Sequence, residues 1–199
     1  PGLSFPQMVR GESEREALYR FLRNDRVRHT QLIEPHLEAT CRRMHDRPLV
    51  LVAHDTTEFS FPGESRRPGL GKLPNGQGFL GHFALAVDAA ERVPLGICGL
   101  ETLFRDEKRG EAEARRRAPD KESLRWSRLA NAVAERAQHA ALIHLMDREG
   151  DTYETLVKLV AGHQRFVIRQ KHDRIADVGS DSVMSLMERV AAAPALLER

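Results

Sequence analysis

The order of patterns along the chain predicts an α/β protein with a mixed sheet and flanking helices, preceded by an N-terminal helical segment. The first observation is a succession of two helical patterns, three strand patterns, and then helix, strand, helix and strand. The second is a short polar link between two neighbouring strand patterns, which is typical of an antiparallel hairpin. The third is the later alternation of helix and strand, which indicates parallel neighbours. With 199 residues, 41% of them hydrophobic, the chain is long enough to bury one core.

The N-terminal segment is expected to hold two helices. Ser13 and Glu16 have the spacing of a capping box, and apolar residues after them share one helical face. A second helix is expected from 30 to 44, and Pro48 requires it to end before that point. Its apolar stripe consists of Ile33, Leu37, Cys41 and Met44.

Three strands are expected next. The run 49–53 is short and aliphatic, as in a strand that is buried on both faces, and His54, Asp55, Thr56 and Thr57 follow at its end. Glycines and prolines dominate 62–81, which predicts a long loop. The ranges 79–87 and 93–103 then form the predicted antiparallel hairpin.

The second half begins with a highly charged segment, 105–117, that we expect to be solvated. Asp120 is the predicted cap of a helix with an apolar face, and a strand is expected over 142–146. Asp151 and Glu154 resemble a helix cap, so we assign Asp151 to structure. The remaining predictions are a helix face of Tyr153, Leu156, Val157 and Val160, a strand over 165–169, and a last helix with Val183, Leu186, Met187 and Val190.

Composition limits the classes of function. The net charge is only +2, so an anionic partner is allowed without being required. Two cysteines without metal-ligand spacing favour a reducing cytoplasm. The aliphatic run at 49–53 is far shorter than the roughly 20 residues that cross a bilayer, so no membrane association is expected. The chain opens on Pro1 and closes on a helix-like run to Arg199, so we interpret it as part of a longer protein.

Two aspartates stand at the ends of predicted strands, Asp55 after the first and Asp147 after the fourth. If these strands are parallel neighbours, about 4.8 Å apart, both carboxylates emerge at one edge of the sheet. Hard oxygen ligands favour Mg²⁺ or Mn²⁺, and such a pair suits phosphoryl transfer. Taken singly, however, Asp55 can form an Asx turn and Asp147 can simply terminate a strand.

Four stretches, "AHDTTEF", "PDKESLRW", "MDREGDTYE" and "RFVIRQKHDR", occur in an order and at separations that resemble the bacterial DDE transposases with a YREK motif. These are insertion-sequence enzymes that cut and paste DNA through a hairpin intermediate. The resemblance also includes "ALYRFLRND" near the N-terminus. It implies an RNase H-like fold and assigns catalysis and metal binding to Asp55 and Asp147, with Mg²⁺ or Mn²⁺ as the cofactor.

The same resemblance implies a domain organisation, with an N-terminal helical segment over 1–47, a partial RNase H-like catalytic core over 48–178, and the start of an insertion or connecting helix over 179–199. The third acid of such enzymes is the Glu of Tyr-x-x-Arg-x-x-x-Glu, and nothing after Arg169 matches that signature. Glu188 and Glu198 lack its context. We therefore expect a core that is truncated before its last helix and is inactive alone.

In the full-length protein the resemblance implies double-stranded DNA partners, namely transposon ends and target, as well as a homodimer and a bacterial, nucleoid-associated location. The residues expected to contact DNA phosphates are all basic. They are Arg148, Arg169, Lys171 and His172 near the strand ends, and Arg66, Arg67 and Lys72 on the glycine-rich segment. Surface ion pairing of Arg148 with Glu149 or Glu154 is an equal alternative.

Two other functions remain open from the sequence. One is a degenerate or domesticated remnant that binds DNA or protein without chemistry, which the missing Glu permits. The other is a different metal-dependent phosphohydrolase with Asp55 as nucleophile. That reaction favours a second aspartate two residues further on, where this chain has Thr57.

Overall fold

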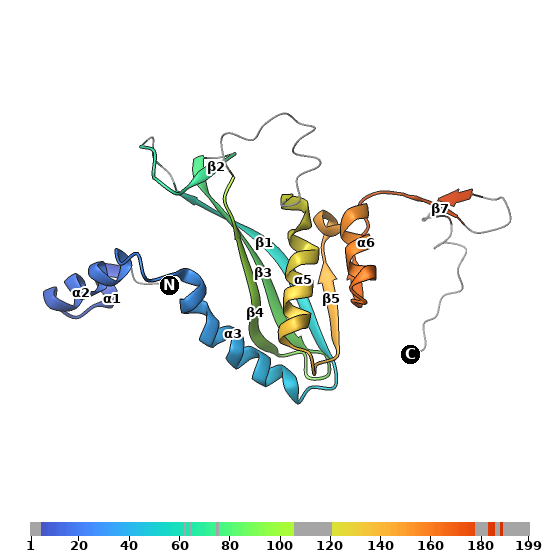
Figure 1. Ribbon diagram of the computed structural model, residues 1–199, viewed down its shortest axis with the longest axis horizontal. Coiled ribbons are helices and arrows are strands. Elements are labelled where there is room, and N and C mark those ends of the chain that lie inside the picture. Colours follow the sequence, from blue (N-terminus) through green and yellow to red (C-terminus); the bar gives the residue numbers. More distant parts are fainter. Residues whose placement is uncertain are drawn as a thin grey trace.

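The computed structural model describes residues 5–61, 63, 65–74, 76–105, 121–177, 183–185 and 188. A six-stranded sheet stands at the centre, with α3 beside it and α5 and α6 against it, and α1 and α2 lie apart from it (Figure 1). The helices are α1 (Phe5–Met8), α2 (Glu12–Leu22), α3 (His29–His45), α5 (Arg125–Arg136) and α6 (Tyr153–Ala161), with 3-10 turns η1 (Glu122–Leu124) and η2 (Arg148–Gly150).

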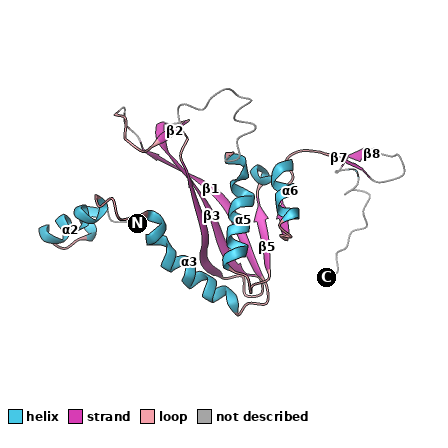
Figure 2. Ribbon diagram, in the orientation of Figure 1, coloured by secondary structure: helices cyan, strands magenta, loops and turns pink. Residues whose placement is uncertain are grey.

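The sheet is mixed, as predicted (Figure 2). Antiparallel pairs join β1 to β3, and β3 to β2 and β4, while parallel pairs join β1 to β5 and β5 to β6. This arrangement of a mixed sheet with flanking helices is compatible with an RNase H-like fold. The strands are β1 (Val50–Phe61), β2 (Gly71–Leu73), β3 (Gly76–Asp88), β4 (Pro94–Leu103), β5 (Leu142–Met146) and β6 (Phe166–Ile168), and a separate pair is formed by β7 (Ile175–Asp177) and β8 (Val183–Ser185).

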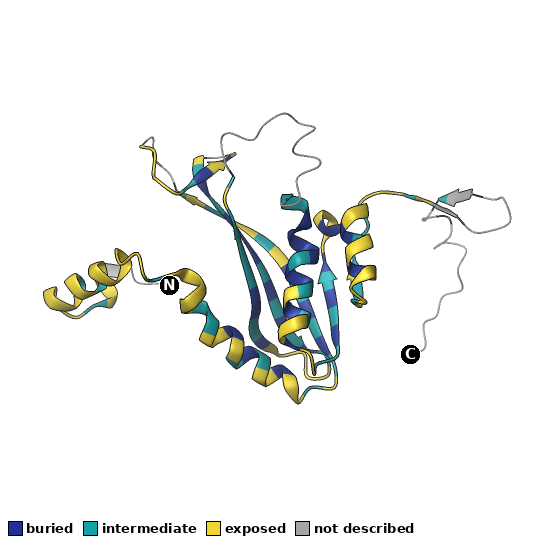
Figure 3. Cartoon of the chain, viewed as in Figure 1, coloured by how far each residue is buried: buried dark blue, intermediate teal, exposed yellow. Residues whose placement is uncertain are grey.

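One face of the sheet packs on the helices and forms the core (Figure 3). Val50 and Val52 belong to one buried cluster with Met44 of α3 and with Leu129 and Val133 of α5. A second cluster joins α5 to α6 and β5, through Trp126, Ala130, Leu159 and Met146. The opposite face carries side chains that stay half-buried or exposed, namely Leu51, Ala53, Leu85, Val87, Ile143, Leu145 and Val167. One face of the sheet is therefore covered by helices, whereas side chains on the other face remain accessible to a ligand.

The predicted strand at 49–53 was too short. β1 continues to Phe61 because every residue from Val50 onward pairs with β3. The predicted loop at 62–81 was correspondingly too long, since β2 and the start of β3 lie within it. Gly63, Gly69 and Gly76 have positive φ, as the predicted turns require, whereas Gly78 allows close approach: a Cβ there would lie 1.9 Å from the carbonyl oxygen of Phe59.

The N-terminal helices were predicted with mixed success. α3 confirms the helix expected at 30–44, and it buries Leu37 and Met44 as the stripe requires. The capping box was wrong, because α2 begins at Glu12 with Gly11 as its N-cap and without a side-chain cap. Ser13 therefore lies within the first turn. No residue of α2 is buried, so its apolar face is not held by the sheet.

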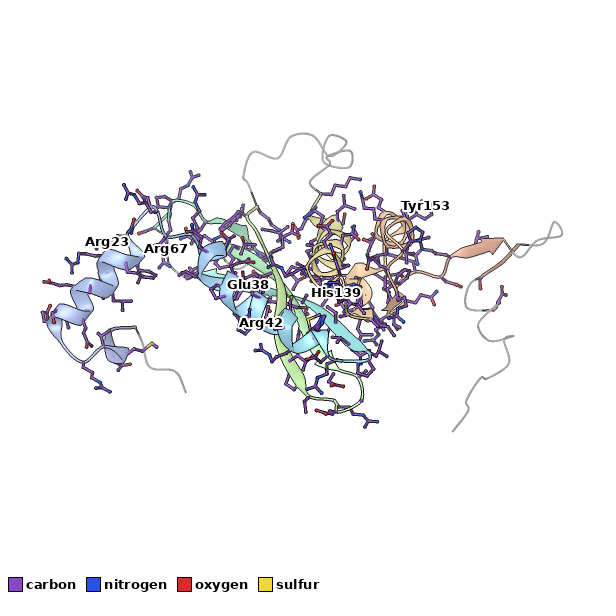
Figure 4. All side chains as sticks on the ribbon, turned by 60° about the horizontal axis from the view of Figure 1, so that its bottom comes forward. Arg23, Glu38, Arg42, Arg67, His139 and Tyr153 are labelled. Atoms are coloured by element: carbon purple, nitrogen blue, oxygen red, sulfur yellow. The ribbon has the colours of Figure 1, made fainter. Side chains whose placement is uncertain are left out.

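Three predictions in the second half also changed. In α6 the buried residues are Thr155 and Leu159, whereas Tyr153, labelled in Figure 4, is 74% exposed. Val183 pairs with Asp177 in a short strand and not in the predicted last helix, whose Leu186, Met187 and Val190 lie outside the described residues. Arg105 is half-buried and forms an ion pair with Glu122, so the charged segment is anchored at its first residue. The rest of that segment and Asp120 lie outside the described residues.

Candidate functional site

Asp55 and Asp147 follow the paired parts of two neighbouring parallel strands, β1 and β5. β1 and β5 pair from Val50 with Leu142 to Ala53 with Leu145, and two further steps place Asp55 beside Asp147. Neighbouring strands are separated by about 4.8 Å. Side chains alternate along a strand, so both carboxylates project from the face opposite the helices, and both are exposed. The parallel pairing inferred from the sequence is confirmed, although Asp55 lies inside β1 rather than at its end.

Asp147 has a structural role as well as an exposed position. Its Oδ1 accepts a hydrogen bond from the Glu149 N–H at 2.8 Å, which caps η2. A carboxylate oxygen can accept further bonds, and Oδ2 makes no hydrogen bond to another described residue. The cap therefore fixes the orientation of the carboxylate without using both oxygens.

Arg169 extends the row by one strand. β5 and β6 pair up to Met146 with Ile168, and the next step places Arg169 beside Asp147. The Arg169 N–H donates to the Met146 carbonyl at 3.0 Å, which continues the parallel ladder by one bond. Arg169 is exposed and shares its face with the two aspartates. We call Asp55, Asp147 and Arg169 the edge row.

Asp151 holds the segment that follows Arg169. Its Oδ2 accepts from the backbone N–H groups of Lys171 at 2.6 Å and His172 at 3.0 Å, and its Oδ1 accepts from Arg174 at 2.5 Å. Burial alone would raise the pKa of this carboxyl, but the two N–H donors and the Arg174 guanidinium outweigh it and lower the pKa. The N-cap of α6 is Thr152, so the assignment of Asp151 to helix capping was wrong.

Three histidines lie on the helix-covered face of β1, β3 and β5, opposite the face of the edge row. His54, His82 and His144 are 5%, 0% and 0% exposed. His54 Nε2 and His144 Nδ1 are 2.9 Å apart, and His82 Nδ1 lies 2.9 Å from Thr56 Oγ1. Burial lowers the pKa of His82 to about 3 and that of His144 to about 4, and it lowers the pKa of His54 well below its usual range, helped by the other two rings. All three are therefore neutral at pH 7.

Arg125 connects the segments that carry the two aspartates, and sequence reasoning missed it. Its side chain is 7% exposed, and it donates to Thr56 Oγ1 at 3.0 Å and forms an ion pair with Glu149. Thr56 follows Asp55, and Glu149 lies two residues after Asp147. Arg125 lies within "PDKESLRW", one of the four stretches that carry the resemblance, and this position was the feature of the sequence that could have identified it.

The other predicted DNA contacts divide by location. Arg148 is exposed, and it pairs with neither Glu149, which binds Arg125, nor Glu154, which binds Lys121. Lys171 and His172 are exposed next to the edge row. Arg66 and Arg67 lie in the connection between β1 and β2, and Lys72 lies on β2, beyond the end of β1 that is far from Val50. The other four of the seven basic residues follow β5 or β6, as Asp147 does.

A divalent cation fits the edge row in ligand chemistry. Mg²⁺ is commonly held by one or two carboxylates and completes its shell with water. Asp55 and Asp147 supply two carboxylates, and the described residues contain no cluster of three or more His, Cys, Asp or Glu side chains in ligand geometry.

Within the described ranges, no helix is long and apolar enough to cross a membrane.

Comparison with known proteins adds little beyond the geometry. No protein-family model matches the chain. Among solved structures, a chain of the crystal structure of a pre-cleavage Mos1 transpososome aligns with 69% of this chain at 14% sequence identity and a TM-score of 0.24. The alignment spans 40% of that chain. A TM-score this low does not establish a common fold.

Proposed function

We propose that this chain is the partial catalytic core of a DDE transposase, which in its full-length form cleaves DNA phosphodiester bonds and transfers strands. The observation that carries the proposal is the parallel pairing of β1 with β5, because its register, continued by two residues, sets Asp55 beside Asp147. Two exposed carboxylates at adjacent positions can supply oxygen ligands to one divalent cation. Their exposure on the open face leaves them accessible to a metal ion and to a phosphate.

The residues of the edge row have complementary roles in this proposal. Asp55 and Asp147 would hold Mg²⁺ or Mn²⁺, and a bound divalent cation stabilises negative charge on a phosphoryl oxygen. Arg169 is placed to contact a phosphate next to the carboxylates, because it occupies the adjacent strand position. Arg148, Lys171 and His172 are exposed and lie within three residues of Asp147 or Arg169 in the chain, and they would follow the DNA backbone.

The edge row contains two acids, whereas the proposed chemistry uses three. Glu188 is exposed, and its carboxylate accepts from the Ser185 N–H in a local turn. Glu198 lies outside the described residues. We propose that the third acid belongs to a longer protein, together with its dimer contacts, and that the 199-residue chain binds metal without cleaving DNA. A reading frame that continues past Arg199 with Y-x-x-R-x-x-x-E supports this, whereas an intact frame without it favours a non-catalytic remnant.

Metal binding tests the edge row directly. At an Mn²⁺ concentration about ten times Kd, binding to the folded state adds about 1.4 kcal/mol to the free energy of unfolding, which raises Tm by about 3–5 °C in a chain of this length. Asp55→Asn and Asp147→Asn are each expected to remove this rise. The amide oxygen introduced by Asp147→Asn still accepts the Glu149 N–H, so the cap of η2 survives. The measurement is thermal unfolding with and without Mn²⁺.

Glu58→Gln is the matched control, because Glu58 is an exposed acid on the same strand but on the other face. It is expected to keep the Mn²⁺ response of the unchanged chain. A response that persists in both aspartate variants means that the pair is not a metal site.

A further inference from the structure

Five phenylalanines gather at the end of the sheet beyond the edge row. Phe59 and Phe79 are stacked with ring centroids 4.9 Å apart, and Phe104 lies 5.4 Å from Phe79. Phe83 lies 6.2 Å from Phe59, and Phe61 lies 6.3 Å from Phe79. We call these five residues the phenylalanine strip. They are five of the eight phenylalanines in the chain, so this concentration is not a random scatter of apolar residues.

The strand register places the strip on the same face as the edge row. Phe83 is the cross-strand partner of Asp55, and Phe59 is the partner of Phe79. Directly opposed residues of an antiparallel pair share a face. Gly81 lies between these pairs, and a Cβ there would be 2.8 Å from the rings of both Phe59 and Phe83. The strip is therefore continuous with the carboxylates, and its rings close over a glycine.

The rings of the strip remain accessible. Phe104 is 47% exposed, and the other four are half-buried. Rings that served only the core would face α3, α5 and α6, where the buried clusters lie. Their position on the open face provides flat apolar surfaces next to a phosphate-binding row.

The charges around the strip favour an anion. Lys72 and Phe61 both pair with Gln77, so Lys72 shares the face of the strip, and the Arg67 guanidinium lies 5.6 Å from the centre of the Phe61 ring. Strand alternation puts the remaining acids of β1, β3 and β4 on the other face. Those acids are Glu58, Asp88 and Glu101.

We propose that the phenylalanine strip stacks unpaired nucleobases of a DNA strand whose phosphates lie along the edge row and the cations at the far end. The bases must be unpaired, because the π-faces of bases inside a duplex are covered by their neighbours. Aromatic rings beside cations are the usual elements of single-strand binding, and the stacking is tolerant of sequence. The inference rests on the proposed function, since DNA must occupy the edge row.

The test compares a blunt DNA duplex with the same duplex bearing a short single-stranded extension that contains 2-aminopurine. Fluorescence anisotropy gives the two affinities without metal, and quenching of 2-aminopurine reports stacking. The unchanged chain is expected to bind the extended duplex more tightly and to quench the probe. Phe59→Leu and Phe104→Leu each remove a ring, and each is expected to weaken binding of the extended duplex by about fivefold or more while leaving blunt-duplex affinity unchanged.

Phe21→Leu is the control, because Phe21 is 43% exposed on α2 and lies outside the strip. Equal affinity for both DNAs, or unchanged quenching in the Phe59 and Phe104 variants, overturns the stacking site. A lower Tm in those variants with no change in DNA binding would instead assign the strip to packing against protein. The Mn²⁺ response of the same variants is read separately, so a failure of the strip is distinguishable from a failure of the metal site.

Discussion

The free energy of unfolding is expected to fall steeply as the pH drops below about 6.5, the usual pKa of histidine. His54, His82 and His144 are buried and neutral in the folded protein, and their pKa values lie below 6.5. The unfolded chain therefore binds more protons than the folded one between pH 6.5 and the folded values, which are about 4 for His144 and about 3 for His82. The contribution of these three histidines to stability is complete above pH 6.5 and is lost as the pH falls across that window.

Each buried neutral histidine contributes a slope of about 1.4 kcal/mol per pH unit, so three together approach about 4 kcal/mol per pH unit. Urea unfolding at a series of pH values measures this slope. His144→Gln removes one titrating ring from the cluster and is expected to reduce the slope by about one third. His45→Gln, at an exposed histidine on α3, is expected to leave it unchanged. Equal slopes in the His144 variant and the unchanged chain would show that the cluster is not held neutral.

Asp151→Ala is expected to lower the free energy of unfolding by about 3–5 kcal/mol at pH 7. The change deletes an acceptor that is 3% exposed and leaves the N–H groups of Lys171 and His172 and the Arg174 guanidinium without it. Because the pKa of Asp151 is lowered from 3.8, its contribution is present above that pH and declines as the pH falls through the folded value. Urea unfolding at pH 7 provides the measurement.

Asp25→Ala is the reference variant, since Asp25 is exposed, and its effect should stay within about 0.5 kcal/mol. Asp151→Asn should fall between the two, because an amide oxygen still accepts one N–H but carries no charge for Arg174. A loss below about 1 kcal/mol in Asp151→Ala would contradict the buried network.

The parts of the fold that were predicted correctly have local and strong patterns. The strand at Leu142–Met146 is a short apolar run that ends in charged residues, and the helix at His29–His45 is limited by Pro48. The parallel pairing of β1 with β5 followed from topology, because a helix that connects two strands of one sheet brings them side by side in parallel. Chain order and alternation were sufficient for that conclusion.

The parts that were missed depend on contacts between distant segments. β1 extends to Phe61 through pairing with β3. Its second half contains threonine, serine and a glutamate, and these polar residues do not predict a buried strand. The partners of Asp151 lie about twenty residues away, so its local context suggested a cap instead. The phenylalanine strip assembles from three separate segments of the chain, and only the register reveals that its rings share a face with Asp55.

The sheet separates two different environments, a buried layer under the helices and a face open to solvent. His54 and Asp55 are consecutive, yet the first is buried under the helices near Trp126 and the second faces solvent. An ion could not reach the carboxylates through the helical layer without disrupting the core. In the proposed function, metal and DNA would therefore both approach the carboxylates from the open face of the sheet.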